Sequence, residues 1–128
     1  MLKAIQTSDA PAALGPYSQA IQAGDWLYVS GQIPFDPATM ELVGEADIKA
    51  QTRQALVNLQ AVVVEAGATL ENVVKCQVFL QDMGDFTKVN EIYAEFFDGD
   101  TPPARACVEV ARLPKDVLVE IDCVAFLG

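Results

Sequence analysis

Apolar side chains recur at spacings of three and four residues in two stretches of the chain, which is the spacing of one helix face. The first stretch is 46–66, where Asp47 is a candidate N-cap and Gly67 stands where a left-handed glycine often ends a helix. The second stretch is 85–97, with Asp85 as its candidate N-cap and Gly99 just beyond its end. Both stretches are predicted to be helices that pack on a core.

Six other segments alternate or are rich in β-branched residues, as strands are, and are bounded by Gly, Pro or Asp. They are 4–6, 17–23, 27–32, 73–81, 104–110 and 117–126. The element order is then β-β-β-α-β-α-β-β, without a linker or an internal repeat. One sheet with both helices on a single face is the simplest layered arrangement. The sequence therefore predicts an α+β fold, with a six-stranded mixed sheet in one domain spanning residues 1–128.

The strands predicted at 73–81, 104–110 and 117–126 each have one apolar face and one face that mixes charge with large apolar groups. The apolar faces comprise Val74, Cys76, Val78 and Leu80; Ala104, Ala106, Val108 and Val110; and Val117, Val119, Ile121, Cys123 and Ala125. A mixed face is typical of a subunit interface, and the alternative is a monomer with an open face. If Arg105, Cys107 and Glu120 share that face, they could converge on a ligand, or Arg105 and Glu120 could form only a structural ion pair.

Composition narrows the chemistry. The 128 residues include 8 Lys and Arg, 18 Asp and Glu, no histidine and 3 cysteines, for a net charge of −10. Without histidine there is no Ser-His-Asp or Cys-His catalysis and no imidazole metal site. The negative charge argues against binding nucleic acid or an anionic membrane. The cysteines form no CxxC pair or zinc-like cluster, so we expect no metal site. No apolar run is long enough to span a bilayer and no secretory signal is evident, so we expect a cytoplasmic protein.

Four blocks carry a resemblance to a known family: LGPYSQ (14–19), VSGQIP (29–34), DFTKVNEIYAEFF (85–97) and ARACVEVARLPKDVLVEID (104–122). In this order and at this spacing they resemble the RidA branch of the YjgF-type, or Rid, superfamily. The resemblance implies a homotrimer of chorismate-mutase-like subunits, with a central barrel and a cleft between each pair of neighbours. It also implies hydrolysis of reactive 2-imino and enamine acids to 2-oxo acids and ammonia, with no cofactor and no metal.

The resemblance also implies roles for single residues. Arg105 matches the arginine that holds the substrate carboxylate, because a planar guanidinium can form two parallel hydrogen bonds with it. Glu120 matches the carboxyl near the attacking water. Cys107 matches a residue of the same cleft, where a lining role is favoured over a nucleophilic one because no histidine is present to activate the thiol. The other expected cleft residues are Tyr17, Ser30, Gly31, Phe86 and Asn90.

Two other functions compete with hydrolysis. A trimer that senses 2-oxo acids or related small carboxylates would share the cleft and Arg105 but would not need Glu120. Ribonuclease activity, attributed to some relatives, conflicts with the charge of −10 and the absence of histidine. The chain departs from the family pattern in two places, neither at a catalytic position: Ala106 stands where many relatives have serine, and Ala12-Ala13-Leu14 varies a common Ala-Ile sequence.

Overall fold

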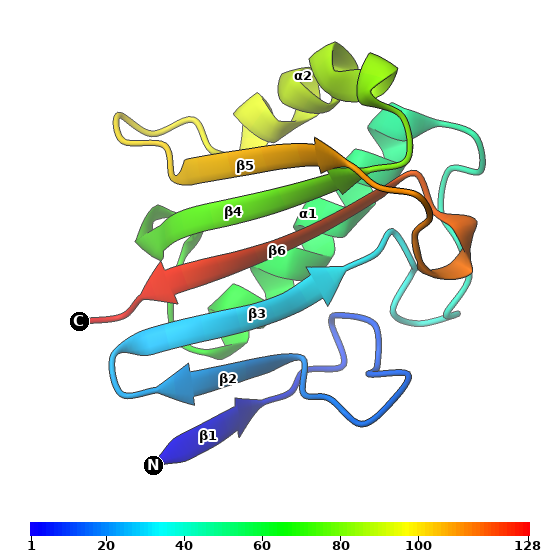
Figure 1. The fold of residues 1–128 in the computed structure, drawn as a ribbon. Coiled ribbons are helices and arrows are strands. Elements are labelled where there is room, and N and C mark those ends of the chain that lie inside the picture. The colour runs from blue at the N-terminus through cyan, green and yellow to red at the C-terminus, as the bar shows by residue number, and fades with distance from the viewer.

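The computed structural model describes all residues, 1–128, and its elements follow the predicted order (Figure 1). The strands are β1 (Leu2–Ile5), β2 (Ala20–Ala23), β3 (Trp26–Gln32), β4 (Val73–Leu80), β5 (Ala104–Glu109) and β6 (Val119–Phe126). The helices are α1 (Ile48–Glu65) and α2 (Phe86–Phe96), with short 3₁₀ turns η1 (Leu70–Asn72), η2 (Met83–Asp85) and η3 (Pro114–Asp116). Neither helix is both long and apolar enough to cross a membrane.

The six strands form one mixed sheet in the order β1-β2-β3-β6-β4-β5. Only β4 and β5 run parallel, because α2 connects them as a crossover, and the other neighbours are antiparallel. Both helices lie on the same side of the sheet, with α1 behind its middle and α2 near the β5 edge (Figure 1). The α+β fold with a six-stranded mixed sheet and two helices is therefore confirmed. We call the uncovered side of the sheet the open face.

The core lies between the sheet and α1. Leu56, Leu59 and Val63 of the helix are fully buried against sheet residues such as Val78 and Ile121. Burying a side chain of this size contributes about 1.5–3 kcal/mol of transfer free energy. This layer fixes which side of each central strand faces the helices.

The limits of α1 agree with the prediction. Asp47 accepts hydrogen bonds from the backbone N–H groups of Lys49 and Ala50, both at 3.1 Å. At the other end Gly67 has φ +88°, and the following N–H, that of Ala68, donates to the carbonyl of Val63 at 3.2 Å. A side-chain cap at the start and a left-handed glycine at the end satisfy backbone groups that the helix leaves unpaired.

The limits of α2 differ from the prediction. Asp85 precedes the helix but its side chain makes no capping hydrogen bond, because the chain enters α2 from the turn η2. It is Asp82 that accepts a hydrogen bond there, from the N–H of Gly84 at 2.8 Å. The helix ends at Phe96 with Phe97 as its C-cap, so Gly99 does not terminate it.

Three strand predictions need correction. Residues 17–19 precede β2 rather than belonging to it, since the N–H of Tyr17 bonds to the carbonyl of Gly15 in a tight turn after which the chain turns into the strand. Val74 is exposed and Val73 is buried, because an extra residue of β4 opposite β6 at this point shifts the alternation. Val117 is buried but lies outside β6, in a small second cluster with Phe35 and Leu113.

A further correction concerns the faces of β5. Its parallel register pairs Arg105 with Cys76 and Cys107 with Val78, both of which face the helices. Arg105 and Cys107 therefore lie on the helix side, while Ala106 and Val108, expected on the core face, are exposed on the other side. The alternation was predicted correctly but the assignment of its two faces was wrong.

Candidate functional site

The side chain of Arg105 lies between the edge strand β5 and helix α2. Its Nη1 donates a hydrogen bond to Asn90 Oδ1 at 2.7 Å. The guanidinium carbon lies 4.8 Å from the ring centre of Tyr93 and 5.4 Å from that of Phe86, within the range of cation–π attraction. An amide and two aromatic rings thus hold the guanidinium in one place.

All three residues that hold Arg105 come from one face of α2. Phe86, Asn90 and Tyr93 are four and then three residues apart, which is the spacing of neighbours along one side of a helix. The parallel pairing of β4 with β5 sets Arg105 beside this face. Tyr93 was not among the residues expected at the site, although its spacing from Phe86 and Asn90 already places it on the same face of the helix.

Arg105 differs from the other two arginines in having no carboxylate partner. Arg53 pairs with Glu95 at 2.6 Å and Arg112 with Asp116 at 2.7 Å. The guanidinium of Arg105 is partly buried, and the hydrogen bond to Asn90 uses only one of its five N–H groups. An oriented cation with free donors and no counter-ion is suited to bind a small anion, and a carboxylate fits its planar fork.

Cys107 lies two residues further along the same face of β5 and is half-buried against the core. Burial raises the pKa of its thiol, and the nearby Arg105 only partly offsets this effect. The thiol is therefore protonated at neutral pH, and protonated thiols are poor nucleophiles. This setting is consistent with the expected lining role.

Glu120 lies on the open face of β6, between the buried residues Val119 and Ile121. Burial raises the pKa of its carboxyl, and the like charge of Asp122 two residues along raises it further. Its carboxyl makes no hydrogen bond or ion pair within the chain, and Arg105 is not among the groups that shift its pKa. Glu120 is thus a half-buried acid with a free carboxyl.

Gly31 borders the carboxyl of Glu120 directly. A Cβ at position 31 would overlap the carboxylate oxygen Oε2 and lie 2.7 Å from Cδ. Any other residue there would have to push the carboxyl aside. The absence of a side chain at Gly31 therefore decides where the Glu120 carboxyl can lie.

Ser30 and Tyr17 lie near Gly31. The Ser30 hydroxyl donates to the carbonyl of Ser18 at 2.6 Å, which ties β3 to the segment before β2. The Tyr17 hydroxyl accepts a hydrogen bond from the N–H of Leu14 at 3.2 Å. Behind them the buried amide of Gln19 accepts from the N–H of Thr7 at 2.7 Å and donates to three carbonyls of the same loop. This network holds the loop that carries Tyr17.

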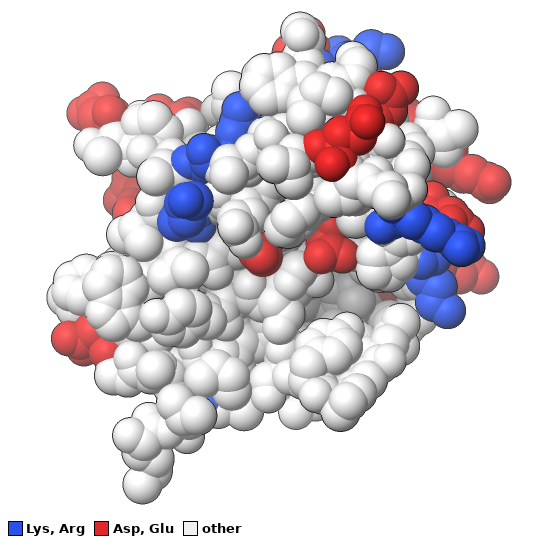
Figure 2. Space-filling model, viewed as in Figure 1, with Lys and Arg blue, Asp and Glu red and all other residues white.

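Tyr17 and Ser30 also line a shallow hollow of about 580 Å³ on the open face, together with Lys75, Asp122 and others. Large apolar side chains are uncovered beside it: Tyr28 is 52% exposed, Trp26 42% and Phe126 38%. Figure 2 shows this face, where few charged side chains lie over β1 to β3. A face this apolar is typical of a surface that another protein chain covers.

The expected convergence of Arg105, Cys107 and Glu120 on one face does not occur within the chain. Arg105 and Cys107 face the helices from β5, whereas Glu120 faces the other way from β6, with β4 between the two strands. The alternative of a structural Arg105–Glu120 ion pair is also wrong, since the two form no salt bridge. We call Phe86, Asn90, Tyr93, Arg105 and Cys107 the arginine cluster, and Tyr17, Ser30, Gly31 and Glu120 the glutamate cluster.

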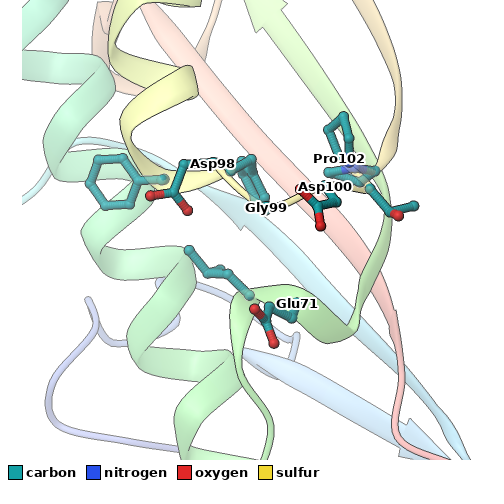
Figure 3. Close-up of a pocket in the computed structure, with 10 residues that line it drawn as sticks. Glu71, Asp98, Gly99, Asp100 and Pro102 are labelled. Atoms are coloured by element: carbon teal, nitrogen blue, oxygen red, sulfur yellow. The ribbon is translucent and has the colours of Figure 1, made fainter.

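A separate pocket of about 270 Å³ lies between the loop after α2 and the turn η1 (Figure 3). The carboxylates of Glu71, Asp98 and Asp100 border it, and none of the expected site residues does. No group of three or more His, Cys, Asp or Glu side chains in the chain is arranged to hold a metal ion. This pocket is distinct from both clusters.

The fold and the unpaired arginine define an α+β protein with a candidate site for a small carboxylate, and comparison with known proteins identifies the family. The sequence pattern of the Endoribonuclease L-PSP family matches residues 7–127. A RutC family protein from Synechocystis is 60% identical over 126 residues, 98% of this chain and 97% of that protein. The chain belongs to this family, which includes proteins named RutC and Rid.

Two solved structures show the same fold. RidA from the Antarctic bacterium Psychrobacter superposes with a TM-score of 0.93 at 45% identity, covering 97% of this chain and 98% of its own. TdcF from E. coli, solved with bound serine, has a TM-score of 0.93 at 44% identity, covering 98% of this chain and 99% of its own. These similarities confirm membership of the broader family, and the RidA branch stays a prediction.

Proposed function

We propose that this protein is a hydrolytic deaminase of reactive 2-imino and enamine acids, which it converts to 2-oxo acids and ammonia. The observation that carries the proposal is the Arg105 guanidinium, held by Asn90 and two rings and left without a carboxylate partner. The family relationship supports it, and so does the serine bound to TdcF, a small molecule with the same carboxylate group.

In the proposed reaction Arg105 binds the substrate carboxylate through parallel hydrogen bonds. The protonated imine carbon is then attacked by a water molecule that Glu120 orients and deprotonates. The resulting carbinolamine receives that proton on nitrogen and the C–N bond breaks. As ammonia leaves and the C=O bond of the 2-oxo acid forms, the hydroxyl proton passes to the Glu120 carboxylate and from there to solvent. A raised pKa suits Glu120 to accept a proton from water and return it to the departing nitrogen.

The two clusters lie on opposite faces of the sheet, so this reaction needs a second copy of the chain. We propose that the active form is a homotrimer, in which the arginine cluster of one subunit meets the glutamate cluster of its neighbour across a cleft. The exposed Trp26, Tyr28 and Phe126 of the open face support an assembly that covers this surface. Such an interface is heterologous, and a closed ring contains as many clefts as subunits.

The first experiment is a coupled assay with Arg105→Lys. Threonine dehydratase generates the 2-imino acid, and release of 2-oxobutanoate is followed with wild type, with the variant and without this protein. The lysine keeps the charge but loses the planar fork, so we expect kcat/KM to fall about tenfold to a hundredfold, in keeping with about 1.5–3 kcal/mol for hydrogen bonds to charged groups. No acceleration by wild type over the spontaneous reaction would refute the enzyme function.

A carboxylate sensor without turnover is the alternative, and the same assay distinguishes it. A sensor would bind 2-oxobutanoate in an Arg105-dependent way, measured by calorimetry, but would leave the rate of imine hydrolysis unchanged. In a sensor, Glu120→Gln would leave ligand binding intact and would not change the rate of imine hydrolysis. Arg53→Lys is the matched control, because its partner Glu95 is on the exposed helix surface, away from both clusters.

A further inference from the structure

Tyr93 is the most buried of the three residues that hold Arg105. It is 8% exposed, whereas Phe86 at the start of α2 is 37% exposed. The Tyr93 ring also lies closer to the guanidinium, at 4.8 Å against 5.4 Å. It also packs against the ring of Phe97, with ring centres 4.6 Å apart. Tyr93 is therefore a fixed surface against which the guanidinium lies.

The hydroxyl of Tyr93 does not help to hold Arg105. It is buried beside the thiol of Cys76, which is a weak partner, and makes no hydrogen bond of normal geometry. Cys76 is the residue that pairs with Arg105 in the β4–β5 register, so the ring lies over the same rung of the sheet as the arginine. The part of Tyr93 that acts on Arg105 is the ring.

The geometry also defines which N–H groups of the Arg105 guanidinium stay free to bind a ligand. The guanidinium carbon lies over the Tyr93 ring and Asn90 accepts an N–H of Nη1, while Nε and Nη2 have no hydrogen-bond partner within the chain. A long arginine side chain otherwise samples many rotamers, and a ligand must restrict them on binding. A ring that restricts the side chain beforehand raises affinity without touching the ligand.

We propose that Tyr93 is a positioning residue: its buried ring orients the Arg105 guanidinium so that the free N–H groups point at the carboxylate of the ligand. The ligand in this statement rests on the proposed function, while the orientation of Arg105 is a property of the free protein. The two parts are tested separately.

The first test observes Arg105 directly by ¹⁵N NMR of the arginine Nε–H groups. The chain has only three arginines, at 53, 105 and 112, and Arg105→Lys assigns the signal by its loss. We expect the Arg105 signal to be shifted upfield by the ring current and to exchange with water more slowly than the others. Tyr93→Leu should clearly reduce both effects, leaving only the contribution of the Phe86 ring, and Tyr93→Phe should retain them. An Arg105 signal that is the same in Tyr93→Leu and wild type would overturn the proposal.

The second test measures 2-oxobutanoate binding by calorimetry. A cation–π contact of this kind corresponds to about a twofold to thirtyfold change in affinity, so Tyr93→Leu should weaken binding by about that factor and Tyr93→Phe should restore it. In the coupled assay the loss should lie in KM, with kcat nearly unchanged. Wild-type affinity in a Tyr93→Leu protein whose Arg105 signal has a reduced upfield shift would overturn the positioning role.

Two controls separate positioning from a general loss of stability. Ile92→Ala removes a buried side chain of the same helix that is not one of the three residues holding the guanidinium, and it should leave the Arg105 signal and 2-oxobutanoate affinity unchanged. Tyr93→Met fills similar space without a ring and replaces Tyr93→Leu if that variant does not fold. A wild type that binds no 2-oxobutanoate would refute the proposed function, and the NMR comparison would still decide whether Tyr93 orients Arg105.

Discussion

The arginine cluster and the glutamate cluster are built in opposite ways. Arg105 is held in place by Asn90, Phe86 and Tyr93 before any ligand arrives. Glu120 has no hydrogen-bond or ion-pair partner for its carboxyl, which is half-buried and occupies the space that a side chain at position 31 would fill. In the proposed reaction this difference suits Arg105 to hold a carboxylate and Glu120 to exchange a proton.

The largest expected effect concerns the separation of the clusters. Arg105→Ala and Glu120→Gln should each lower imine hydrolysis at least a hundredfold, since each removes one half of the proposed site. If neighbouring subunits supply the two halves, unfolding and refolding an equimolar mixture should restore about a quarter of wild-type activity, because random mixing in a closed ring leaves about one cleft in four intact. The rate of 2-oxo acid release measures this.

The control for this experiment is the same mixture combined without unfolding, which should stay inactive as long as the assemblies do not exchange subunits. Two halves supplied by one subunit would give no recovery in either mixture. That result would contradict the proposed cleft between subunits.

The second prediction concerns the space above Gly31. Gly31→Ala should displace the Glu120 carboxyl and lower kcat about tenfold to a hundredfold, since a misplacement of about 1 Å can have an effect of that size. Binding of 2-oxobutanoate through Arg105 should change much less, because a Cβ at position 31 meets Glu120 and none of the residues that hold Arg105. Gly99→Ala is the control, because a Cβ at position 99 meets no atom within 4 Å. Equal losses of binding and of kcat would contradict the independence of the clusters.

The third prediction follows from the raised pKa of Glu120. A folded-state pKa above the unfolded one means that the folded protein binds its proton more tightly, so this group favours folding at low pH and less so as the pH rises through its folded-state pKa. Glu120→Gln should therefore raise the melting temperature at pH 7 relative to wild type, and this advantage should shrink below the usual carboxyl range. Thermal unfolding at several pH values measures it. Asp122→Asn should act in the same direction, because burial also raises the pKa of Asp122.

The smallest effect concerns the entry to α2, the helix that carries three residues of the arginine cluster. Asp82→Ala removes the acceptor of the Gly84 N–H and should lower the free energy of unfolding by about 0.5–1 kcal/mol. Asp85→Ala should change it by less than about 0.5 kcal/mol, since that side chain makes no capping bond. Urea unfolding of both variants gives the comparison. A larger loss in Asp85→Ala would show that Asp85 does cap the helix.

Much of the fold could be predicted because it depends on neighbours in the chain. Asp47 and Gly67 act within one helical turn, so their residue types already indicate where α1 begins and ends. The alternation of β6 identified Glu120 as a residue of the open face for the same local reason. The bulge at Val73 and Val74 could not be predicted, because it depends on how β4 meets β6.

The candidate site also has features that the sequence could predict and features that depend on packing between distant segments. Residue types drew attention to Arg105 and Glu120, since a fork-shaped cation and an acid are chemical properties of the residues themselves. Their expected roles, and Gly31 altogether, came from the resemblance of four sequence blocks to a known family. Which face of β5 carries Arg105 depended on its parallel pairing with β4, and the contact with Tyr93 depended on where the crossover helix α2 comes to lie. Strand alternation defines two faces but does not label them, because only packing between distant segments gives each face its neighbours.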